Sequence, residues 1–317
     1  MSNNSELESA NKKAQYAFDK ATDTYYVGTT SYGVALYNGA ADPDWCIGDV
    51  PHGGGILSII TDSVLRHFSD KHQKDPVAMN GFFLHKSEVG PCVIAIQDLK
   101  TSRKGYCLVK ASLLQPIKDK SYVLASADQF DPEQYKEKVH VIFTMGNMDT
   151  EEGVTYFHEP YQPPNRDVME PYNFVFMSEF VESRLDLTGS AEGETPGRPE
   201  FNQSIKFKDG RETDFKAIPY WCDMFIPPPV MLGQGVIDGP CWCPTMQLEV
   251  QFKRRPKAKE VLCTIASPHI INSRFDASGG VWDLEGNLIA ITRHQCLIVP
   301  WSRNTKRDVS DESSSKL

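Results

Sequence analysis

Three consecutive glycines, Gly53, Gly54 and Gly55, open an apolar segment and can take part in chemistry through their backbone. If the segment is helical, its first N–H groups have no partner inside the helix, and the helix dipole favours negative charge beside them. Glycine lets a ligand or another backbone approach such N–H groups closely. They could therefore polarise a carbonyl group and stabilise the oxyanion that forms during its hydrolysis. The alternative is that the glycines only allow tight packing of a helix on a sheet.

A basic cluster, Lys253 to Lys259 ("KRRPKAK"), interrupts a chain whose formal net charge is −9. Arg254 and Arg255 in this cluster offer the planar fork that binds phosphate through two hydrogen bonds. The alternative is a solvated hairpin. The acidic net charge argues against a nucleic-acid partner, which favours a strongly basic face.

The eight cysteines are scattered, and several lie in apolar runs where cysteine acts as a small hydrophobic residue. Cys241 and Cys243 form a lone C-x-C pair, which is a poor zinc signal without a second pair or a suitable histidine. We therefore expect reduced thiols and neither a metal nor a cofactor. No apolar run reaches the length of a membrane span, and the first residues lack the pattern of a secretory signal.

The sequence ends in Ser315-Lys316-Leu317, after a polar run from Ser302 to Ser314. A carboxyl-terminal Ser-Lys-Leu is the tripeptide that the peroxisomal import receptor reads as an address. The polar run is expected to hold the tripeptide clear of the fold. Chance is the alternative, because polar tails are rich in serine and lysine. The sequence thus predicts the peroxisomal matrix as the location and the import receptor as a partner.

One buried helix followed by four strands is expected in the first half. The segment after Pro51, "HGGGILSIITDSVLRHF", predicts a largely buried helix because apolar residues recur at helical spacing: Ile56, Ile59, Ile60, Val64 and Phe68. Short β-branched or aromatic runs separated by turn residues then predict strands at 78–85, 91–99, 104–114 and 139–145.

The second half repeats this order with a weaker helix. Residues 212–225 ("ETDFKAIPYWCDMF") predict a short helix that the three prolines at 227–229 stop. Strand signals lie on both sides of this helix, at 174–187, 201–207, 245–252, 261–267, 273–284 and 288–299. The turn "LEGN" between the last two runs carries the glycine of a hairpin. The pattern predicts an α+β fold with an internal duplication.

These segments, in this order, resemble the thioesterase-like superfamily of double-hotdog acyl-CoA thioesterases. The chain is similar to the bacterial-type acyl-CoA thioesterase II and resembles a fungal-type member of the superfamily. In the first half the resemblance rests on "DWCIGDVPHGGGIL" and "GFFLHKSEVGPCVIAIQDLKTSRKGYCLVKASLLQ". In the second half it rests on "IKFKDGRETD", "YWCDMFIPPPV", "CPTMQLEVQF" and "GVWDLEGNLIAITRHQ". It implies two hotdog domains in tandem, each a curved antiparallel sheet around a central helix. The implied activity is hydrolysis of acyl-CoA to free acid and CoA, in lipid and fatty-acid metabolism.

The resemblance also sets the expected domain limits. A double hotdog pairs its two domains within one chain, and many relatives pair further, so a homo-oligomer is compatible with it. We expect a polar extension at 1–20 and an N-terminal hotdog at 21–158. A C-terminal hotdog at 159–302 is expected to contain a Pro-rich linker at 159–172 and a long loop at 188–200, and a disordered tail follows at 303–317.

Three positions of the second hotdog carry the family's catalytic residues, an Asp, a Thr or Ser, and a Gln, which position the attacking water. The resemblance places the first two at Asp223 in "YWCDMF" and Thr245 in "CPTMQL". The chain departs from the family at the third, because "AITRHQ" puts His294 in the Gln position and Gln295 one place later. A one-residue shift turns a strand side chain to the opposite face, so either His294 acts or a β-bulge returns Gln295 to the site. We favour His294, which could act as a base or donate to the water network.

Other readings of the same residues stay open. Asp223 can cap a helix turn or pair with a lysine, and His294 can be a buried core histidine. His52, just before the first helix, would be the base if the chain were a hotdog hydratase or dehydratase. The chain could also hydrolyse a specialised acyl or polyketide intermediate, or bind acyl-CoA without cleaving it. If the chain hydrolyses or binds acyl-CoA, Arg254 and Arg255 would contact the CoA phosphates.

Overall fold

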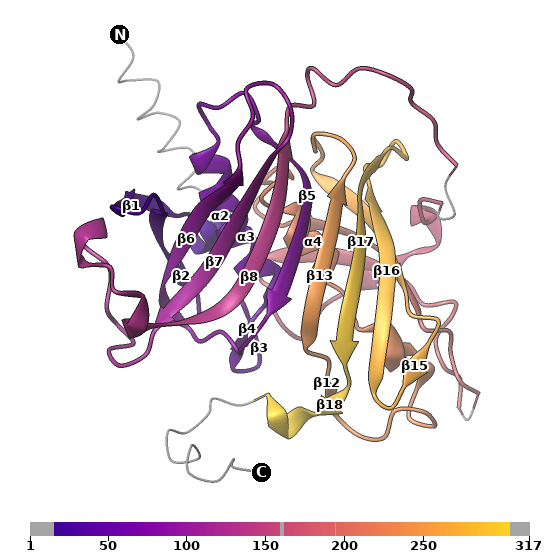
Figure 1. Ribbon diagram of the computed structural model, residues 1–317. Helices are drawn as coiled ribbons and strands as arrows, with labels where there is room; N and C mark the ends of the chain where they lie inside the picture. Colours follow the sequence, from indigo (N-terminus) through magenta and orange to yellow (C-terminus); the bar gives the residue numbers. More distant parts are fainter. Residues whose placement is uncertain (1–15, 159–161, 194, 305–317) are drawn as a thin grey trace.

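A computed structural model describes residues 16–158, 162–193 and 195–304, and shows one long antiparallel sheet behind which the helices pack (Figure 1). The first half contributes six strands to the sheet: β1 (Tyr25–Thr29), β2 (Ala35–Ala41), β5 (Asp75–Phe83), β6 (Gly90–Lys100), β7 (Cys107–Pro116) and β8 (Tyr135–Gly146). The second half contributes eight: β9 (Glu170–Tyr172), β10 (Val181–Asp186), β11 (Glu200–Phe207), β13 (Thr245–Phe252), β14 (Glu260–Ala266), β15 (Ile270–Ile271), β16 (Arg274–Trp282) and β17 (Leu288–Leu297).

The two halves meet edge to edge in this sheet. Its strand order is β1-β2-β6-β7-β8-β5-β13-β17-β16-β14-β11-β10-β9, with β15 paired to β16. The join is the antiparallel pair β5–β13, which runs from Phe82 opposite Gln247 to Ala78 opposite Gln251. Each half therefore completes the edge of the other, which leaves no open strand edge in the middle of the molecule.

Among the described residues, three α-helices lie behind the sheet in Figure 1: α2 (Ala17–Thr22), α3 (Gly53–His67) and α4 (Ile218–Asp223). Helix α3 is buried from Gly54 to Val64, as its apolar stripe predicts, and the buried stretch also contains the polar residues Ser58, Thr61, Asp62 and Ser63. Helix α4 is shorter than the predicted 212–225, because Pro219 fits only the first turn of a helix and so prevents an earlier start. Each hotdog thus wraps its part of the sheet around one central helix.

Short elements complete the structure. Two small antiparallel sheets pair β3 (Cys46–Ile47) with β4 (Val50–Pro51) and β12 (Cys241–Trp242) with β18 (Val299–Pro300). There are also five 3₁₀ turns: η1 (Ala127–Gln129), η2 (Pro132–Gln134), η3 (Arg166–Val168), η4 (Pro228–Leu232) and η5 (Trp301–Arg303). No helix in the described ranges is both long and apolar enough to cross a membrane.

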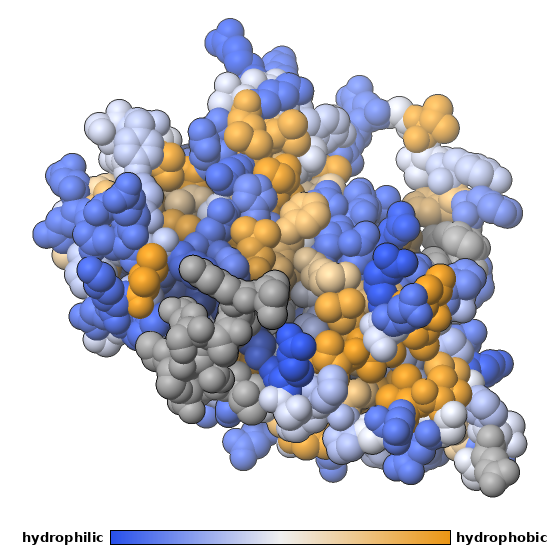
Figure 2. Space-filling view, turned by 60° about the horizontal axis from the view of Figure 1, so that its bottom comes forward, coloured by the Kyte–Doolittle hydropathy of each residue, from blue (hydrophilic) through white to orange (hydrophobic). Residues whose placement is uncertain are grey.

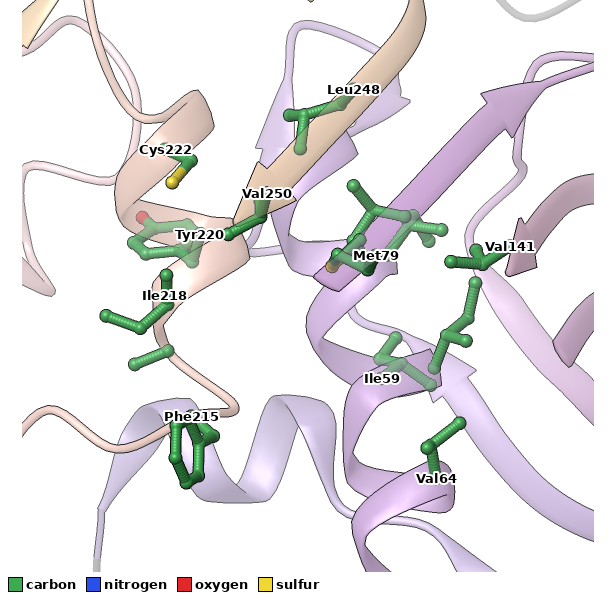
Figure 3. Close-up of a cluster of buried hydrophobic side chains, with 14 of the residues drawn as sticks. Ile59, Val64, Met79, Val141, Phe215, Ile218, Tyr220, Cys222, Leu248 and Val250 are labelled. Atoms are coloured by element: carbon green, nitrogen blue, oxygen red, sulfur yellow. The ribbon is translucent and has the colours of Figure 1, made fainter. Parts of the chain in front are cut away.

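One apolar core unites the two hotdogs. Figure 3 shows side chains of α3, β5 and β8 facing side chains of α4, β13 and the segment before α4, among them Ile59, Val64, Met79, Val141, Phe215, Ile218, Tyr220, Leu248 and Val250. Burying one such aliphatic side chain stabilises the fold by roughly 1.5–3 kcal/mol. This shared core fixes the start of α3 against α4, where the candidate site lies.

All ten predicted strand runs contain a strand, but the N-terminal elements were not predicted. Helix α2 begins at Ala17, inside the expected polar extension, and Phe18 is fully buried. Strands β1 and β2 were missed because β1 is largely exposed at the sheet edge, and β2 is rich in Ala and Gly, which have weak strand propensity.

Other expected limits also shift. The last three residues of the expected linker form β9, and the expected tail begins inside η5, where Asn304 is buried and accepts a hydrogen bond from the N–H of Asp49. The predicted targeting tripeptide, Ser315 to Leu317, lies outside the described residues.

Candidate active site

The start of α3 and the end of α4 meet at Asp223. The N–H of Gly54 donates a hydrogen bond of 2.6 Å to Asp223 Oδ2, so the carboxylate caps the helix of the other hotdog. A Cβ atom on Gly54 would lie 2.7 Å from the carbonyl oxygen of Pro219 and 2.9 Å from Asp223 Cβ. Only glycine permits this approach, so the expected tight packing at the glycine run is against α4.

His52 lies on the same side of Asp223 as Gly54. Its Nδ1 accepts a hydrogen bond from the N–H of Gly55 at 3.3 Å and is 3.7 Å from Asp223 Oδ2. Burial lowers the pKa of His52 below its ordinary value, against the opposing effect of Asp223. His52 is therefore a neutral ring at pH 7, and its Nδ1 acts as an acceptor at the start of α3.

His294 faces the other oxygen of Asp223. Strand β17 alternates between its two faces, and Thr292, His294 and Cys296 point inward together. His294 Nδ1 is 3.9 Å from Asp223 Oδ1, and Nε2 is 3.0 Å from Thr292 Oγ1. The His294 ring is 1% exposed and packs edge-on against Phe225. Burial lowers its pKa, while Asp223 and the Cys222 carbonyl favour the protonated form.

Gln295 points away from the site. It is exposed on the outer face of the sheet, opposite Gln247 of β13 and Asp276 of β16. The pairing of β17 with both neighbours runs through His294 and Gln295 without a shift. The bulge proposed to return Gln295 to the site is therefore absent from β17, and His294 is the side chain next to Asp223.

A bulge does occur nearby, in β13, and it positions Thr245. The register shifts between Thr245 and Gln247, so Thr245 pairs with Cys296 while Leu248 pairs with His294. Thr245 therefore shares the inner face with His294, and its Oγ1 lies 3.7 Å from Cys296 Sγ. Bulges commonly re-aim a side chain beside an active site, and this one does so for Thr245.

The glycine N–H groups are partly engaged. Gly54 donates to Asp223 and Gly55 donates to His52, which leaves the N–H of Gly53 without an acceptor in the part of the chain that the structure describes. Gly53 is thus the member of the glycine run that can polarise a substrate carbonyl.

The two arginines of the basic cluster lie away from this site. Arg254 Nε donates to the carbonyl of Leu288, and Arg255 Nη2 donates to both oxygens of Asp75. Arg254 follows Leu248, the partner of His294, by six residues, or about 20 Å along a strand. The structure does not bring either residue to Asp223, and their contact with CoA phosphates stays a prediction.

Two neighbours of the site were not anticipated from the sequence. Thr292 Oγ1 contacts Nε2 of His294, and Cys296 Sγ contacts Thr245 Oγ1. The signal was present in the period-two pattern of "TRHQC", which puts Thr292, His294 and Cys296 on one strand face.

The arrangement can hold and activate a water molecule. When the neutral His294 ring carries its proton on Nε2, Asp223 Oδ1 and His294 Nδ1 are both acceptors, and their 3.9 Å separation lets one water donate a hydrogen bond to each. Figure 2 views the molecule with the lower end of Figure 1 turned forward, and on this face apolar patches lie among hydrophilic residues. The site therefore combines a carboxylate with a buried imidazole ring 3.9 Å away.

Two family models match the sequence. One, described as the acyl-CoA thioesterase N-terminal domain, covers residues 41–129. The other, described as the acyl-CoA thioesterase C-terminal domain, covers residues 157–298. Together they span both halves of the sheet and include every residue placed at the site.

Known proteins resemble the chain over almost their whole length. "Thioesterase-like protein TwmA" of Talaromyces wortmannii is 20% identical, with 95% of this chain and 97% of that protein covered. A candidate thioesterase II of Thermobifida fusca superposes with a TM-score of 0.70 at 18% identity, covering 90% of this chain and 98% of the other. Acyl-CoA thioesterase II TesB2 of Mycobacterium marinum gives a TM-score of 0.62 at 13% identity, with 90% and 98% covered. These solved structures show the same double-hotdog fold.

Proposed function

This chain belongs to the acyl-CoA thioesterase family and is a thioester hydrolase, and we propose that the site at Asp223, His294 and Thr245 hydrolyses acyl-CoA to the free acid and CoA. The observation that carries the proposal is the buried pair of acceptors, Asp223 Oδ1 and His294 Nδ1, which face each other across 3.9 Å.

The reaction needs a water, a base and a donor for the oxyanion. The water bridging Asp223 and His294 attacks the thioester carbonyl carbon, and its proton passes to His294 Nδ1. The carbonyl oxygen becomes an oxyanion that the N–H of Gly53 stabilises at the start of α3. The carbon–sulfur bond then breaks, the sulfur takes the proton from His294 to give the CoA thiol, and the acid is released.

Each protein group has a separate task in this scheme. Asp223 Oδ2 is held by Gly54, so only Oδ1 is directed at the water. The negative charge of Asp223 stabilises the imidazolium that forms on His294. The hydroxyl of Thr245, on the same inner face, holds the water or the substrate.

Thiol release from a panel of acyl-CoA substrates tests the proposal. We expect turnover by the wild type, and a loss of roughly 100-fold or more in Asp223→Asn and in His294→Ala. Gln295→Ala and Asp276→Asn are matched controls, because both side chains are exposed on the outer face of neighbouring strands, and each should stay within about twofold of wild type. No thiol release from any member of the panel would contradict the proposal.

A second reaction class has one observation in its favour. His52 has an acidic neighbour, since Asp223 Oδ2 lies 3.7 Å from His52 Nδ1. A hotdog hydratase would use such a pair to add water across an enoyl-CoA double bond. A 3-hydroxyacyl-CoA product formed without thiol release, and lost in His52→Gln, would establish that reaction in place of hydrolysis.

We further propose that the chain acts in the peroxisomal matrix. Support comes from Ser315-Lys316-Leu317, which has the sequence read by the import receptor at a free carboxyl end. A fluorescent reporter ending in residues 305–317 should enter peroxisomes, and the same reporter lacking Leu317 should stay outside. Equal distributions of the two reporters would refute the assignment.

A further inference from the structure

We propose that Thr292 is a positioning residue that fixes the ring tautomer of His294, so that Nδ1 is the nitrogen that takes the proton from the attacking water. The inference rests on the proposed hydrolysis for its catalytic meaning, but it makes a separate statement about one hydrogen bond. It concerns a residue that neither the sequence pattern nor the family resemblance singled out.

The hydroxyl of Thr292 has a single proton to donate. Its Oγ1 lies 3.0 Å from the backbone carbonyl of Glu249 on β13, which can only accept. The proton of Thr292 is therefore committed to Glu249, and a lone pair of Oγ1 faces His294 Nε2 at 3.0 Å. A hydrogen bond at that contact then requires the proton to be on Nε2, which leaves Nδ1 with a lone pair.

The surroundings of Nδ1 agree with this assignment. His294 is 1% exposed, and its Nδ1 has no hydrogen-bond partner in the described part of the chain. An Nδ1–H group beside a carboxylate would be drawn to the 2.7–2.9 Å of a charge-assisted hydrogen bond. The actual separation from Asp223 Oδ1 is 3.9 Å, which suits two acceptors sharing one donor. The nucleophilic water supplies that donor.

Proton transfer gives the ring a new set of partners without moving Thr292. When Nδ1 takes the proton of the water, the imidazolium lies between Asp223 and the carbonyl of Cys222, which both favour it. Nε2–H continues to donate to Thr292, so the ring stays aligned while the proton is carried to the leaving sulfur. Without Thr292 the neutral ring can take the other tautomer, which presents a donor where the water needs an acceptor.

The groups around His294 define what else can titrate. Asp223 and Cys222 lie on α4, His52 lies beyond Asp223 at the start of α3, and Cys296 is on β17 itself. Burial raises the pKa of Cys296 to about 12, so this thiol stays neutral near pH 7. The register neighbours of His294 on β13 and β16 are Leu248 and Ala277, which carry no charge.

Nitrogen-15 NMR of histidine-labelled protein reads the tautomer directly. The sequence has eight histidines, and the His294 signals are identified by their loss in His294→Gln. We expect the wild-type ring to carry its proton on Nε2, the same state in Thr292→Ser, and a mixed or Nδ1–H state in Thr292→Val. An Nδ1–H ring in the wild type would overturn the inference, whether or not the protein hydrolyses thioesters.

Kinetics of the same variants separate positioning from mere packing. In Thr292→Val we expect kcat to fall roughly 100-fold with KM within about twofold, whereas Thr292→Ser should keep kcat within about fivefold. Equal kcat values in Thr292→Val and wild type would reject the positioning role. An equal loss of kcat in Thr292→Val and Thr292→Ser would reject it too. A wild type without thiol release would instead contradict the hydrolase proposal, while the NMR result would still decide the tautomer.

Discussion

His294 is the titratable ring beside Asp223, at the position where the family resemblance implies a glutamine. Its inward direction follows from strand alternation, and its distance from Asp223 follows from the close contact of α3 with α4. A neutral histidine buried beside a carboxylate can accept a proton and then be stabilised as a cation. The fall of kcat at low pH should therefore reflect the protonation of His294.

The pH dependence of activity follows from the lowered pKa of His294. Below this pKa the ring is protonated and no longer accepts a proton from water, so kcat should fall with a midpoint below pH 6.5. The profile of kcat against pH between 4.5 and 8 measures this midpoint. A limb centred above pH 7 would contradict a buried neutral histidine as the base.

The stability of the fold should depend on pH in the same direction. His52 and His294 both have pKa values lowered by burial, so the unfolded chain binds protons below about pH 6.5 while the folded chain does not. The free energy of unfolding should thus decrease as the pH falls below about 6.5. Above that pH, the contribution of these two histidines to the free energy of unfolding should be constant. Urea unfolding from pH 8 to pH 5 measures the slope, and it should be smaller in His294→Gln; an unchanged slope would argue against a neutral buried ring.

At the scale of elements, the contact of α3 with α4 decides whether the site forms. Gly54→Ala should weaken thiol release strongly and lower the free energy of unfolding by about 1–3 kcal/mol, because the added Cβ would collide with the backbone of α4. Gly55→Ala is the matched control, since its Cβ would lie 3.9 Å from His52 Cβ, an ordinary contact. Alanine inside a helix is favoured over glycine, so this control should be neutral or up to about 1 kcal/mol more stable. Equal effects of the two substitutions would show that the approach of α4 is not the cause.

A buried ionic cluster ties α2 and α3 to the segment that leads into α4. Lys216 Nζ lies 2.8 Å from Asp19 and 3.4 Å from Asp62, and all three side chains are at most 6% exposed. Lys216→Met leaves buried carboxylates short of a partner and should cost about 3–5 kcal/mol in urea unfolding. Lys206→Met, which removes a partly exposed pair with Glu182, should change stability by less than about 1 kcal/mol. A loss below 1 kcal/mol for Lys216→Met would mean that this cluster does not hold α4 in place.

At the scale of the whole molecule, the pattern of the sequence predicted an α+β fold with an internal duplication, both central helices and ten strands, and the family resemblance implied the double hotdog. Apolar periodicity carries that information, because it sets which faces are buried. The bulge in β13 and the buried α2 were not predicted, and capping by Asp223 was an open alternative that did not identify α3 as the capped helix. Each depends on contacts between residues far apart in the chain, such as Gly54 with Asp223, which no local pattern records.

The candidate site was also predictable only in part. The resemblance located Asp223, Thr245 and the pair His294 and Gln295, but only the strand register shows which of the pair faces inward. The role of Thr292 needed the hydrogen-bond geometry of the ring.

The central claim is that Asp223 and His294 act on the same water, at a site built where the two hotdogs meet. Its most direct test is a double-mutant cycle of kcat for thiol release in wild type, Asp223→Asn, His294→Ala and the double variant. Because residues that act as a unit are not additive, we predict that the double variant is within about threefold of the slower single variant. Losses that multiply in the double variant would contradict the account, because the two residues would then act independently.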